Sequence, residues 1–277
     1  MGLYPISDIT NAVLNKFFAC LLKPDVNTAK AVSEKTAKDI LSVIKAAIIF
    51  AVNESLIGGF AIKVSLPKEK LNDMRVLSTD EQMVLEKYLC ADMDEYKLGI
   101  YLCLYTGLRV GEICSLMWHD ISLEEKILTV SRTMQRVQAL SDNSSAKTKI
   151  IITDPKSNFS IRLIPLPEWL VLMLNKFRPA DISVDAYLLT GDPKRYIEPR
   201  TLQNRFKTCL QKSGIKKANF HALRHTVATR CVSLGFEIKC LSEILGHSNV
   251  NITLNRYVHP SFDMKRSNMD KLEALHE

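Results

Sequence analysis

The feature that most limits the fold is a block of β-branched residues lying between two longer regions with helical spacing. From Lys126 the chain reads KILTVSRTM, followed by TKIIIT and then IRLIPL, and runs of this kind favour strands. The polar segment SDNSSA separates the first two runs, which predicts one long hairpin. We therefore expect a mainly α-helical, α+β fold that contains a small antiparallel sheet.

The helical regions divide the chain into parts. Apolar residues recur at helical spacing over residues 7–22 and 33–56, and Gly58 with Gly59 ends the second stretch. The charged, poorly periodic sequence KEKLNDMR indicates a linker, and the following Ser78-Thr79-Asp80-Glu81 predicts a capping box at the start of a new helix. The expected parts are a helical unit over 1–66, a linker over 67–77, a larger unit over 78–260 and a tail over 261–277.

The bulk properties narrow the class of protein. A chain of 277 residues has room for about two domains. Its net charge of +7 is a modest indication of a polyanionic partner, and a solvated basic surface explains that charge equally well. No apolar run approaches the ~20 residues needed to cross a bilayer, and the first residues lack the pattern of a secretion signal. We expect no contact with a membrane.

The cysteines point to a reducing compartment. The chain has seven cysteines, an odd number, and none stands in a CxxC pair. This pattern argues against a disulfide framework or a zinc site. The sequence therefore predicts a cytoplasmic protein without a structural metal.

Four segments carry residues suited to phosphate chemistry. They are TGLRVGEICSL from Thr106, DPKSNFSIRLIPL from Asp154, HALRH from His221 and LGHSNVNITLNRY from Leu245. Taken singly, each segment has a plain structural explanation. An arginine after a glycine is usually surface charge, and a His-x-x-Arg pair usually lies on an exposed helix face.

Taken together and in this order, the segments resemble the tyrosine recombinase (phage integrase) family over about residues 78–260. The residues that match the family's catalytic set are Arg109, Lys156, His221, Arg224, His247 and Tyr257. Glu112 matches the acidic residue after the first arginine. The hairpin is long for the family, and Ser157 stands where threonine is frequent. Lys147 and Lys149 lie near the lysine position, and Lys156 is preferred for its KSNFSIR context.

The resemblance implies cleavage of DNA by Tyr257 through a 3′-phosphotyrosyl bond, without a metal or another cofactor. Arg109 and Arg224 would bind the non-bridging phosphate oxygens, because a guanidinium is a permanently charged, planar donor. His247 would donate a further hydrogen bond to the same phosphate.

Proton transfer is divided between two residues in this picture. His221 would accept or relay the phenolic proton, and Lys156 would protonate the departing 5′-oxygen. We expect the pKa of Tyr257 to fall beside the arginines. Glu112 is expected to orient a neighbouring group, and His225 to bond within its own helix.

The resemblance also implies that the helical unit over 1–66 is a core-binding domain, which clamps DNA together with the catalytic domain over 78–260. The implied partner is double-stranded DNA at specific recombination sites, for the integration or excision of a mobile element. The chain would assemble as a dimer or tetramer on DNA, with its tail docked on a neighbouring copy, and DNA-bending accessory proteins are compatible with this scheme. The residues predicted to contact the DNA backbone are Lys35, Lys38, Lys45, Arg162 and Arg200. For the three lysines, solvation of a polar helix face is an equally good explanation.

Three other functions remain to be distinguished. A type IB topoisomerase shares the chemistry but relaxes supercoils without site preference. A DNA-binding regulator would keep the fold without the chemistry, and the complete catalytic set argues against it. A metal-dependent nuclease would need a carboxylate cluster, for which the sequence offers no convincing candidate.

Overall fold

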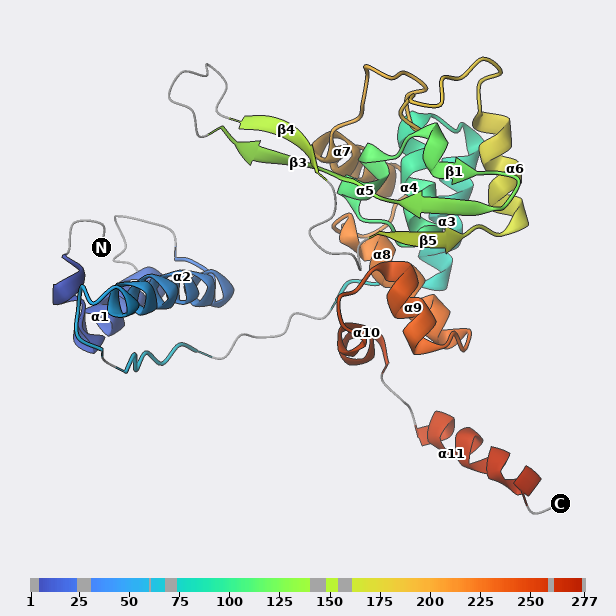
Figure 1. Cartoon of the computed structure of the whole chain (residues 1–277). Helices are drawn as coiled ribbons and strands as arrows, with labels where there is room; N and C mark the ends of the chain where they lie inside the picture. The colour runs from blue at the N-terminus through green and yellow to red at the C-terminus, as the bar shows by residue number, and fades with distance from the viewer. Residues whose placement is uncertain are drawn as a thin grey trace. The chain divides into compact units, whose positions relative to one another are not determined.

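The computed structural model divides the chain into two compact units, Met1–Asp73 and Met74–Glu277. The residues that the structure describes are 5–23, 31–59, 61–67, 74–139, 148–153, 161–258 and 262–275. Within this part of the chain, no helix combines the length and the apolar character needed to cross a membrane. Figure 1 shows the helices and strands of both units.

The first unit is built on two helices. A short 3-10 helix, Ile6–Asp8, precedes α1 (Asn11–Leu22), and α2 (Glu34–Asn53) follows. Thr10 and Ser33 cap α1 and α2 by accepting hydrogen bonds from backbone amides in the first turn, as N-cap residues of their type usually do. These elements confirm the predicted all-helical character of this unit.

An extended segment completes the core of the first unit. Phe18 of α1 and Ala37 and Leu41 of α2 are buried together, and side chains between Ile62 and Leu66 pack against them. The amide of Asn11 donates to the carbonyl of Ala61 over 2.9 Å. The stretch after Gly59 therefore belongs to the first unit.

Of the residues that the structure describes, the second unit contains most of the helices and all of the strands. Its helices are α3 (Thr79–Ala91), α4 (Glu95–Thr106), α5 (Val110–Ser115), α6 (Glu168–Phe177), α7 (Pro199–Lys212), α8 (His221–Ser233), α9 (Ile238–Leu245), α10 (Val250–Tyr257) and α11 (Phe262–Asp270). The 3-10 helices Trp118–Asp120 and Lys271–Leu275 complete the helical set of the described residues. The capping box at Ser78 and Glu81 is confirmed.

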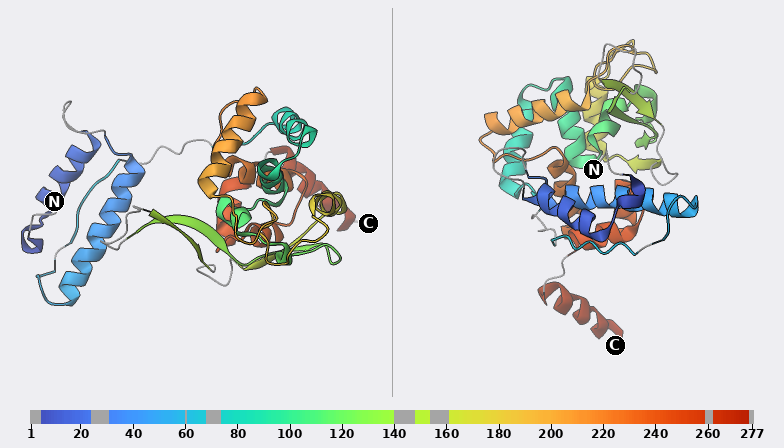
Figure 2. Two further views of the ribbon diagram at one scale, coloured as in Figure 1. Left: turned by 90° about the horizontal axis from the view of Figure 1, so that it is seen from above. Right: turned by 90° about the vertical axis from the view of Figure 1, so that its left-hand side faces the viewer.

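The strands form two antiparallel sheets. β1 (Ile121–Ser122), β2 (Ile127–Val130) and β5 (Arg162–Pro165) form one sheet in the order β1-β2-β5. β3 (Thr133–Gln138) and β4 (Thr148–Thr153) form the long hairpin, which projects from the rest of the second unit (Figures 1 and 2). The mainly helical α+β fold is therefore confirmed, although the run predicted as one strand from Lys126 is split between the two sheets.

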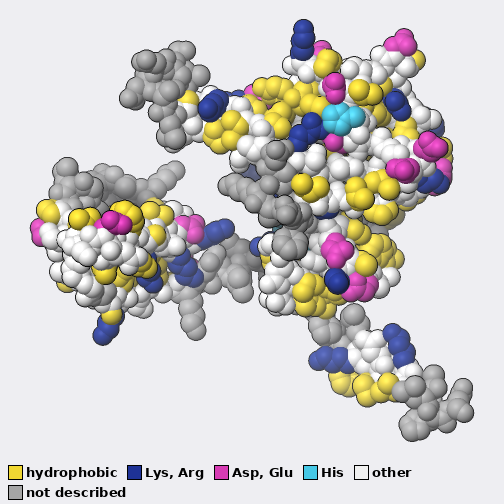
Figure 3. All heavy atoms as spheres, viewed as in Figure 1, with side chains coloured by type: hydrophobic (Ala, Val, Ile, Leu, Met, Phe, Trp, Pro, Cys, Tyr) yellow, Lys and Arg dark blue, Asp and Glu magenta, His cyan; other side chains and the backbone are white. Residues whose placement is uncertain are grey.

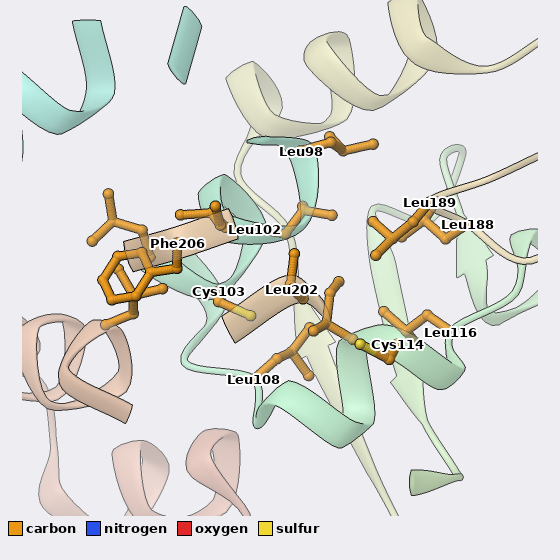
Figure 4. Close-up of a cluster of buried hydrophobic side chains, with 14 of the residues drawn as sticks. Leu98, Leu102, Cys103, Leu108, Cys114, Leu116, Leu188, Leu189, Leu202 and Phe206 are labelled. Atoms are coloured by element: carbon orange, nitrogen blue, oxygen red, sulfur yellow. The ribbon is translucent and has the colours of Figure 1, made fainter. Parts of the chain in front are cut away.

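The main core lies among the central helices of the second unit. Figure 4 shows Leu102 and Cys103 of α4, Leu108, Cys114 of α5 and Leu202 of α7 in one cluster. Gly111 allows α5 to approach β3 closely, because a Cβ atom at this position would lie 2.5 Å from the carbonyl oxygen of Met134. This packing fixes the start of α5 against the hairpin.

A second, smaller buried cluster lies toward the C-terminal end of the second unit. It consists of Ala228, Leu241, Leu245 and Tyr257, which come from α8, α9 and α10.

The linker predicted over 67–77 does not extend to residue 77. Leu77 is fully buried in the main core, and its amide donates to Thr226 Oγ1 over 2.9 Å. Residues 68–73 of that linker lie outside the described residues.

The surface of the second unit carries charges of both signs. Figure 3 shows lysine and arginine side chains interspersed with acidic ones on the face in view. The formal net charge of +7 is therefore not gathered into one basic patch on this face.

Candidate active site

Arg109 is fixed at the start of α5 by Glu112. Its Nη1 donates to Glu112 Oε1 over 2.7 Å, and its backbone amide donates to Glu112 Oε2 over 2.8 Å. Its Nη2 donates to the carbonyl of Gly246 over 2.9 Å. The Arg109 side chain retains 38% exposure, so the guanidinium is oriented by the protein while one side remains accessible.

Glu112 also pairs with a second arginine from β5. Arg162 Nη2 lies 2.9 Å from Glu112 Oε2, and both side chains are 5% exposed. Burial alone would raise the pKa of Glu112, but the hydrogen bond and charge of Arg162, together with Arg109, hold it at about 2. The carboxylate is thus ionised and orients its neighbours, as expected for Glu112.

The burial of Arg162 corrects its predicted role. Its Nε donates to the carbonyl of Ile244 over 2.7 Å, while its Nη groups bind Glu112. A guanidinium buried in this way holds β5 against α5 and α9 and leaves almost no exposed surface, 7% of the residue, for the DNA backbone. The prediction that Arg162 contacts DNA is therefore wrong for this structure.

Arg224 is the most deeply placed cation of the site. It is 2% exposed, its Nη1 donates to the carbonyl of Gly107 over 2.8 Å, and its Nη2 donates to the carbonyl of Leu245. These carbonyls stand at the ends of α4 and α9, where helix dipoles favour positive charge. Burial, followed by the charge of Arg109, lowers the pKa of Arg224 to about 9, so the side chain stays charged at pH 7.

Two glycines make these helix ends possible. Gly107 and Gly246 cap α4 and α9 with φ angles of +66° and +63°, a region that favours glycine. A Cβ atom on Gly246 would also lie 2.9 Å from Arg162 Nη1. The glycines of the TGLR and LGH segments therefore shape the arginine site.

Tyr257 ends α10 with its side chain turned inward. It is 5% exposed, and its hydroxyl lies 2.9 Å from His225 Nδ1. Its ring is stacked on the ring of His247, at 6.3 Å between centroids and 10° between planes. His247 Nδ1 lies 2.8 Å from the hydroxyl of Thr253, a fully buried residue of α10. Two histidines thus hold the tyrosine.

The partner of the tyrosine differs from the predicted one. The sequence predicted that His225 would bond within its own helix, α8. It bonds instead to Tyr257 of α10. His221 lies one helical turn earlier and makes an edge-to-face contact with the His225 ring, at 4.5 Å and 85°. The spacing of these two residues at i and i+4 explains why they meet on one face of α8.

The three histidines are neutral at pH 7. Desolvation, followed by nearby charges, lowers the pKa values of His221 and His225 to about 4 and that of His247 to about 3. Arg224 is one of the positive neighbours that lower the pKa of each of the three histidines. Each ring therefore presents one donor and one acceptor nitrogen.

The pKa of Tyr257 does not follow the expectation. Burial raises it, and this effect outweighs the charges of Arg224 and Arg256, which act in the opposite direction. The predicted fall of the phenol pKa is therefore wrong for the chain without DNA. The hydroxyl is protonated at pH 7, so its proton must be transferred during any attack.

The other predicted residues lie in three places. Lys156 falls within 154–160, outside the described residues. Lys35, Lys38 and Lys45 are exposed on α2 of the first unit. Arg200 is exposed at the start of α7 and lines, together with Arg109 and His221, a cavity of about 450 Å³.

Sequence reasoning missed two residues of that cavity. Gln203 and Lys207 line it beside Arg200, and all three lie on one face of α7. Their spacing at i, i+3 and i+7 was visible in the sequence, but nothing in that spacing shows which face turns toward Arg109. Among the described residues, no three His, Cys, Asp or Glu side chains are grouped as metal ligands would be.

Comparisons with known proteins agree with this geometry. The family model described as the phage integrase family matches residues 75–264. A XerC-like tyrosine recombinase of Caldanaerobacter subterraneus subsp. tengcongensis is 31% identical over 263 residues, covering 88% of this chain and 67% of that protein. The transposase of transposon Tn916 from Enterococcus faecalis is 27% identical over 221 residues, covering 71% of this chain and 52% of its own length.

The fold has solved counterparts as well. The integrase of transposon Tn1549, solved in complex with transposon right-end DNA, superimposes with a TM-score of 0.78 at 23% identity. The match covers 98% of this chain and 87% of that one. The order of the segments, the clustering of their arginines, histidines and tyrosine, and the family match together lead to one conclusion. This chain belongs to the phage integrase family of tyrosine recombinases.

Proposed function

We propose that this chain is a site-specific DNA recombinase that breaks and rejoins strands through a covalent bond between Tyr257 and a 3′-phosphate, for the integration or excision of a mobile element. The observation that carries this proposal is the position of Tyr257, held by His225 and His247 beside the charge of Arg224. The similarity to an integrase solved with transposon-end DNA supports double-stranded DNA as the substrate.

The arginines supply the charge that the transition state requires. Arg109 and Arg224 are oriented by Glu112 and by backbone carbonyls, and each has N–H groups beyond those used in these bonds. Donors that are fixed before the reaction stabilise the growing phosphate charge without reorganisation. We assign both arginines to the non-bridging oxygens of the scissile phosphate.

His247 is assigned to the same phosphate. Its Nδ1 is bonded to the hydroxyl of Thr253, so Nε2 is the nitrogen left to donate. Lys156 remains our candidate for the acid that protonates the 5′-oxygen, on the basis of its sequence context. The face of α7 with Arg200, Gln203 and Lys207 adjoins Arg109, and we propose that it contacts DNA next to the scissile phosphate.

A trapping experiment tests the chemistry. Duplexes tiled across the genomic sequence that flanks the coding region are screened for binding, nicked near the bound site and incubated with the chain in chelator. We expect a covalent protein–DNA adduct on denaturing gels, and none with Tyr257→Phe, because phenylalanine lacks the attacking oxygen. Tyr196→Phe, at a tyrosine that packs on Tyr187, is the control and should form the adduct normally.

The outcomes separate the candidate functions. An adduct that persists in Tyr257→Phe would assign the nucleophile elsewhere. Binding without any adduct from the unaltered chain would favour a regulator. Relaxation of supercoiled DNA lacking the bound site would favour a topoisomerase.

We further propose that the tail of one copy docks on another copy. In α11 and the turn that follows, Phe262, Met269 and Leu272 are 70%, 64% and 48% exposed, and Figure 3 shows hydrophobic side chains on the surface of this segment. A mainly apolar groove of about 860 Å³ lies on the second unit, between α3, α4, α8 and α9. Leu234 and Met83 line it and are 76% and 56% exposed.

The docking of the tail is tested by measuring the amount of dimers and tetramers that form on DNA. We expect deletion of residues 262–277 and the single change Leu234→Asp each to reduce dimers and tetramers on a bound duplex at least about tenfold, since each removes apolar contact worth about 1.5–3 kcal/mol or more. Val184→Asp alters a residue that is 58% exposed away from this groove and serves as the control. Normal assembly of the deletion variant, judged by light scattering, would rule out docking in trans.

A further inference from the structure

A histidine bonded to the oxygen of the nucleophile has no chemical role in the scheme so far. His225 follows Arg224 in the chain and bonds to Tyr257, whereas His221 was expected to receive the tyrosine proton. We propose that His225 accepts the phenolic proton of Tyr257 during strand cleavage and returns it when the strand is rejoined. This inference deepens the proposed function and rests on it.

The geometry suits direct proton transfer. The distance of 2.9 Å between His225 Nδ1 and the hydroxyl of Tyr257 is that of an ordinary hydrogen bond. A neutral imidazole offers one acceptor nitrogen, and a phenol is a better donor than acceptor, so Nδ1 is the acceptor and Nε2 carries the hydrogen. His225 is 8% exposed, which limits competition by water for this contact.

His221 is placed one step further from the oxygen. Its contact is with the His225 ring, edge to face at 4.5 Å between centroids. That contact restricts how the His225 ring can turn, so we regard His221 as a positioning residue for His225. It is also exposed to solvent, and it lines the cavity that contains Arg109.

The charges around His225 link its protonation to the presence of DNA. Arg224 and His221 face it from its own helix, and Arg256 and Tyr257 belong to α10. His247 completes the group as the residue stacked on the tyrosine. Burial and the two arginines oppose a charged His225, so its acceptor nitrogen is free of a proton at pH 7.

A bound phosphodiester changes this balance. Its negative charge, which grows as the phosphorus becomes pentavalent, offsets the repulsion between the arginines and an imidazolium. Proton transfer to His225 is then favoured when a phosphate occupies the site and disfavoured when the site is empty. The nucleophile is thereby activated by its own substrate.

The proposed step is balanced in atoms and charge. The hydroxyl proton of Tyr257 moves to His225 Nδ1 as the phenolic oxygen bonds to phosphorus. The bond from phosphorus to the 5′-oxygen breaks, and that oxygen keeps the electron pair and takes a proton from the general acid. In rejoining, a 5′-hydroxyl gives its proton back to the conjugate base of that general acid as its oxygen attacks phosphorus, the phenolic oxygen leaves with the electron pair of its bond, and His225 returns its proton to that oxygen.

The hydrogen bond itself can be tested without altering His225. Long-range proton–nitrogen spectra of the 15N-histidine-labelled chain should show the Nε2–H tautomer for His225, and Tyr257→Phe should shift its Nδ1 resonance. The Nδ1–H tautomer in the unaltered chain would overturn the proposal, because that nitrogen could not accept a proton. This readout is independent of activity, and hence of whether the proposed recombinase function is correct.

The chemical role of His225 is tested with an ordinary duplex and with a duplex whose leaving atom is sulfur, which needs no acid to depart. His225→Asn should slow single-turnover adduct formation by about 10²–10³-fold, within the range for one acid–base group. A duplex with a bridging 5′-sulfur at the cleaved position should not restore the rate, because the defect is in the nucleophile. The variant's rate should instead rise with pH, as solvent hydroxide replaces the histidine.

Two comparisons make the result decisive. His119→Asn changes a histidine bonded to Asp185, outside the site, and should leave the rate unchanged. The duplex dissociation constant and melting temperature of His225→Asn should stay close to those of the unaltered chain. Cleavage by His225→Asn at the unaltered rate and pH profile would refute the proposal. A pH profile that is altered in His221→Asn and unaltered in His225→Asn would refute it as well. Absence of any adduct from the unaltered chain would instead count against the proposed function.

Discussion

Replacing Arg224 with lysine is expected to slow single-turnover strand cleavage by about 10²–10³-fold, the usual loss when one fixed donor to the transition state is removed. Lysine keeps the charge, but an ammonium cannot reproduce the planar fork that bonds the carbonyls of Gly107 and Leu245. The charge would no longer be held where the phosphate needs it. Duplex affinity should change little, because many phosphate contacts contribute to it.

The measurement is the rate of adduct formation with enzyme in excess over a nicked duplex. Arg178→Lys is the matched control, since Arg178 is an exposed arginine that lies over the Trp118 ring at the end of α6. A rate within threefold of the unaltered chain would show that Arg224 serves the fold alone. Melting curves of both variants separate a loss of chemistry from a loss of structure.

The second large effect concerns stability. Glu112→Gln is expected to lower the free energy of unfolding of the second unit by about 3–5 kcal/mol, because it removes the carboxylate that forms a buried ion pair with Arg162. Both tryptophans, Trp118 and Trp169, lie in this unit, so their fluorescence in urea reports its unfolding. Glu243→Gln, at an exposed position of α9, should change stability by less than about 0.5 kcal/mol.

The effect of Glu112 should depend on pH in a defined direction. Its pKa is about 2 in the folded chain, below its usual value, so the stability it supplies is complete above that usual value. That contribution is lost as the pH falls from about 4.5 towards 2. The difference between the unaltered chain and Glu112→Gln should therefore shrink over this range, and a constant difference would contradict the proposed ion pair.

Local patterns were sufficient for most of the fold. The capping box at Ser78, apolar spacing and β-branched runs identified the helices of both units and the long hairpin. The division of KILTVSRTM between two sheets was not predictable, since the side chains on both sides of Ser131 favour strands. Pairing partners decide such a division, and they lie far along the chain, as with Val130 and Arg162, which are 32 residues apart.

The site shows the same limit more clearly. The motif order indicated Arg109, Arg224 and Tyr257, which the structure places close together. It did not indicate that Arg162 pairs with Glu112, 50 residues earlier. The tyrosine pKa was also misjudged, because sequence reveals nearby charges in a motif but not how deeply the motif is buried.

The small cluster around Tyr257 has a consequence for how often the chain is competent to cut. Tyr257, Ala228, Leu241 and Leu245 are packed apart from the main core. Segments with few buried contacts open at a lower free energy than the domain as a whole. We therefore expect molecules with α9 and α10 opened and the main core intact to form a minor, inactive population. Any partner that binds only the closed form raises the active fraction by population shift, without touching the catalytic groups.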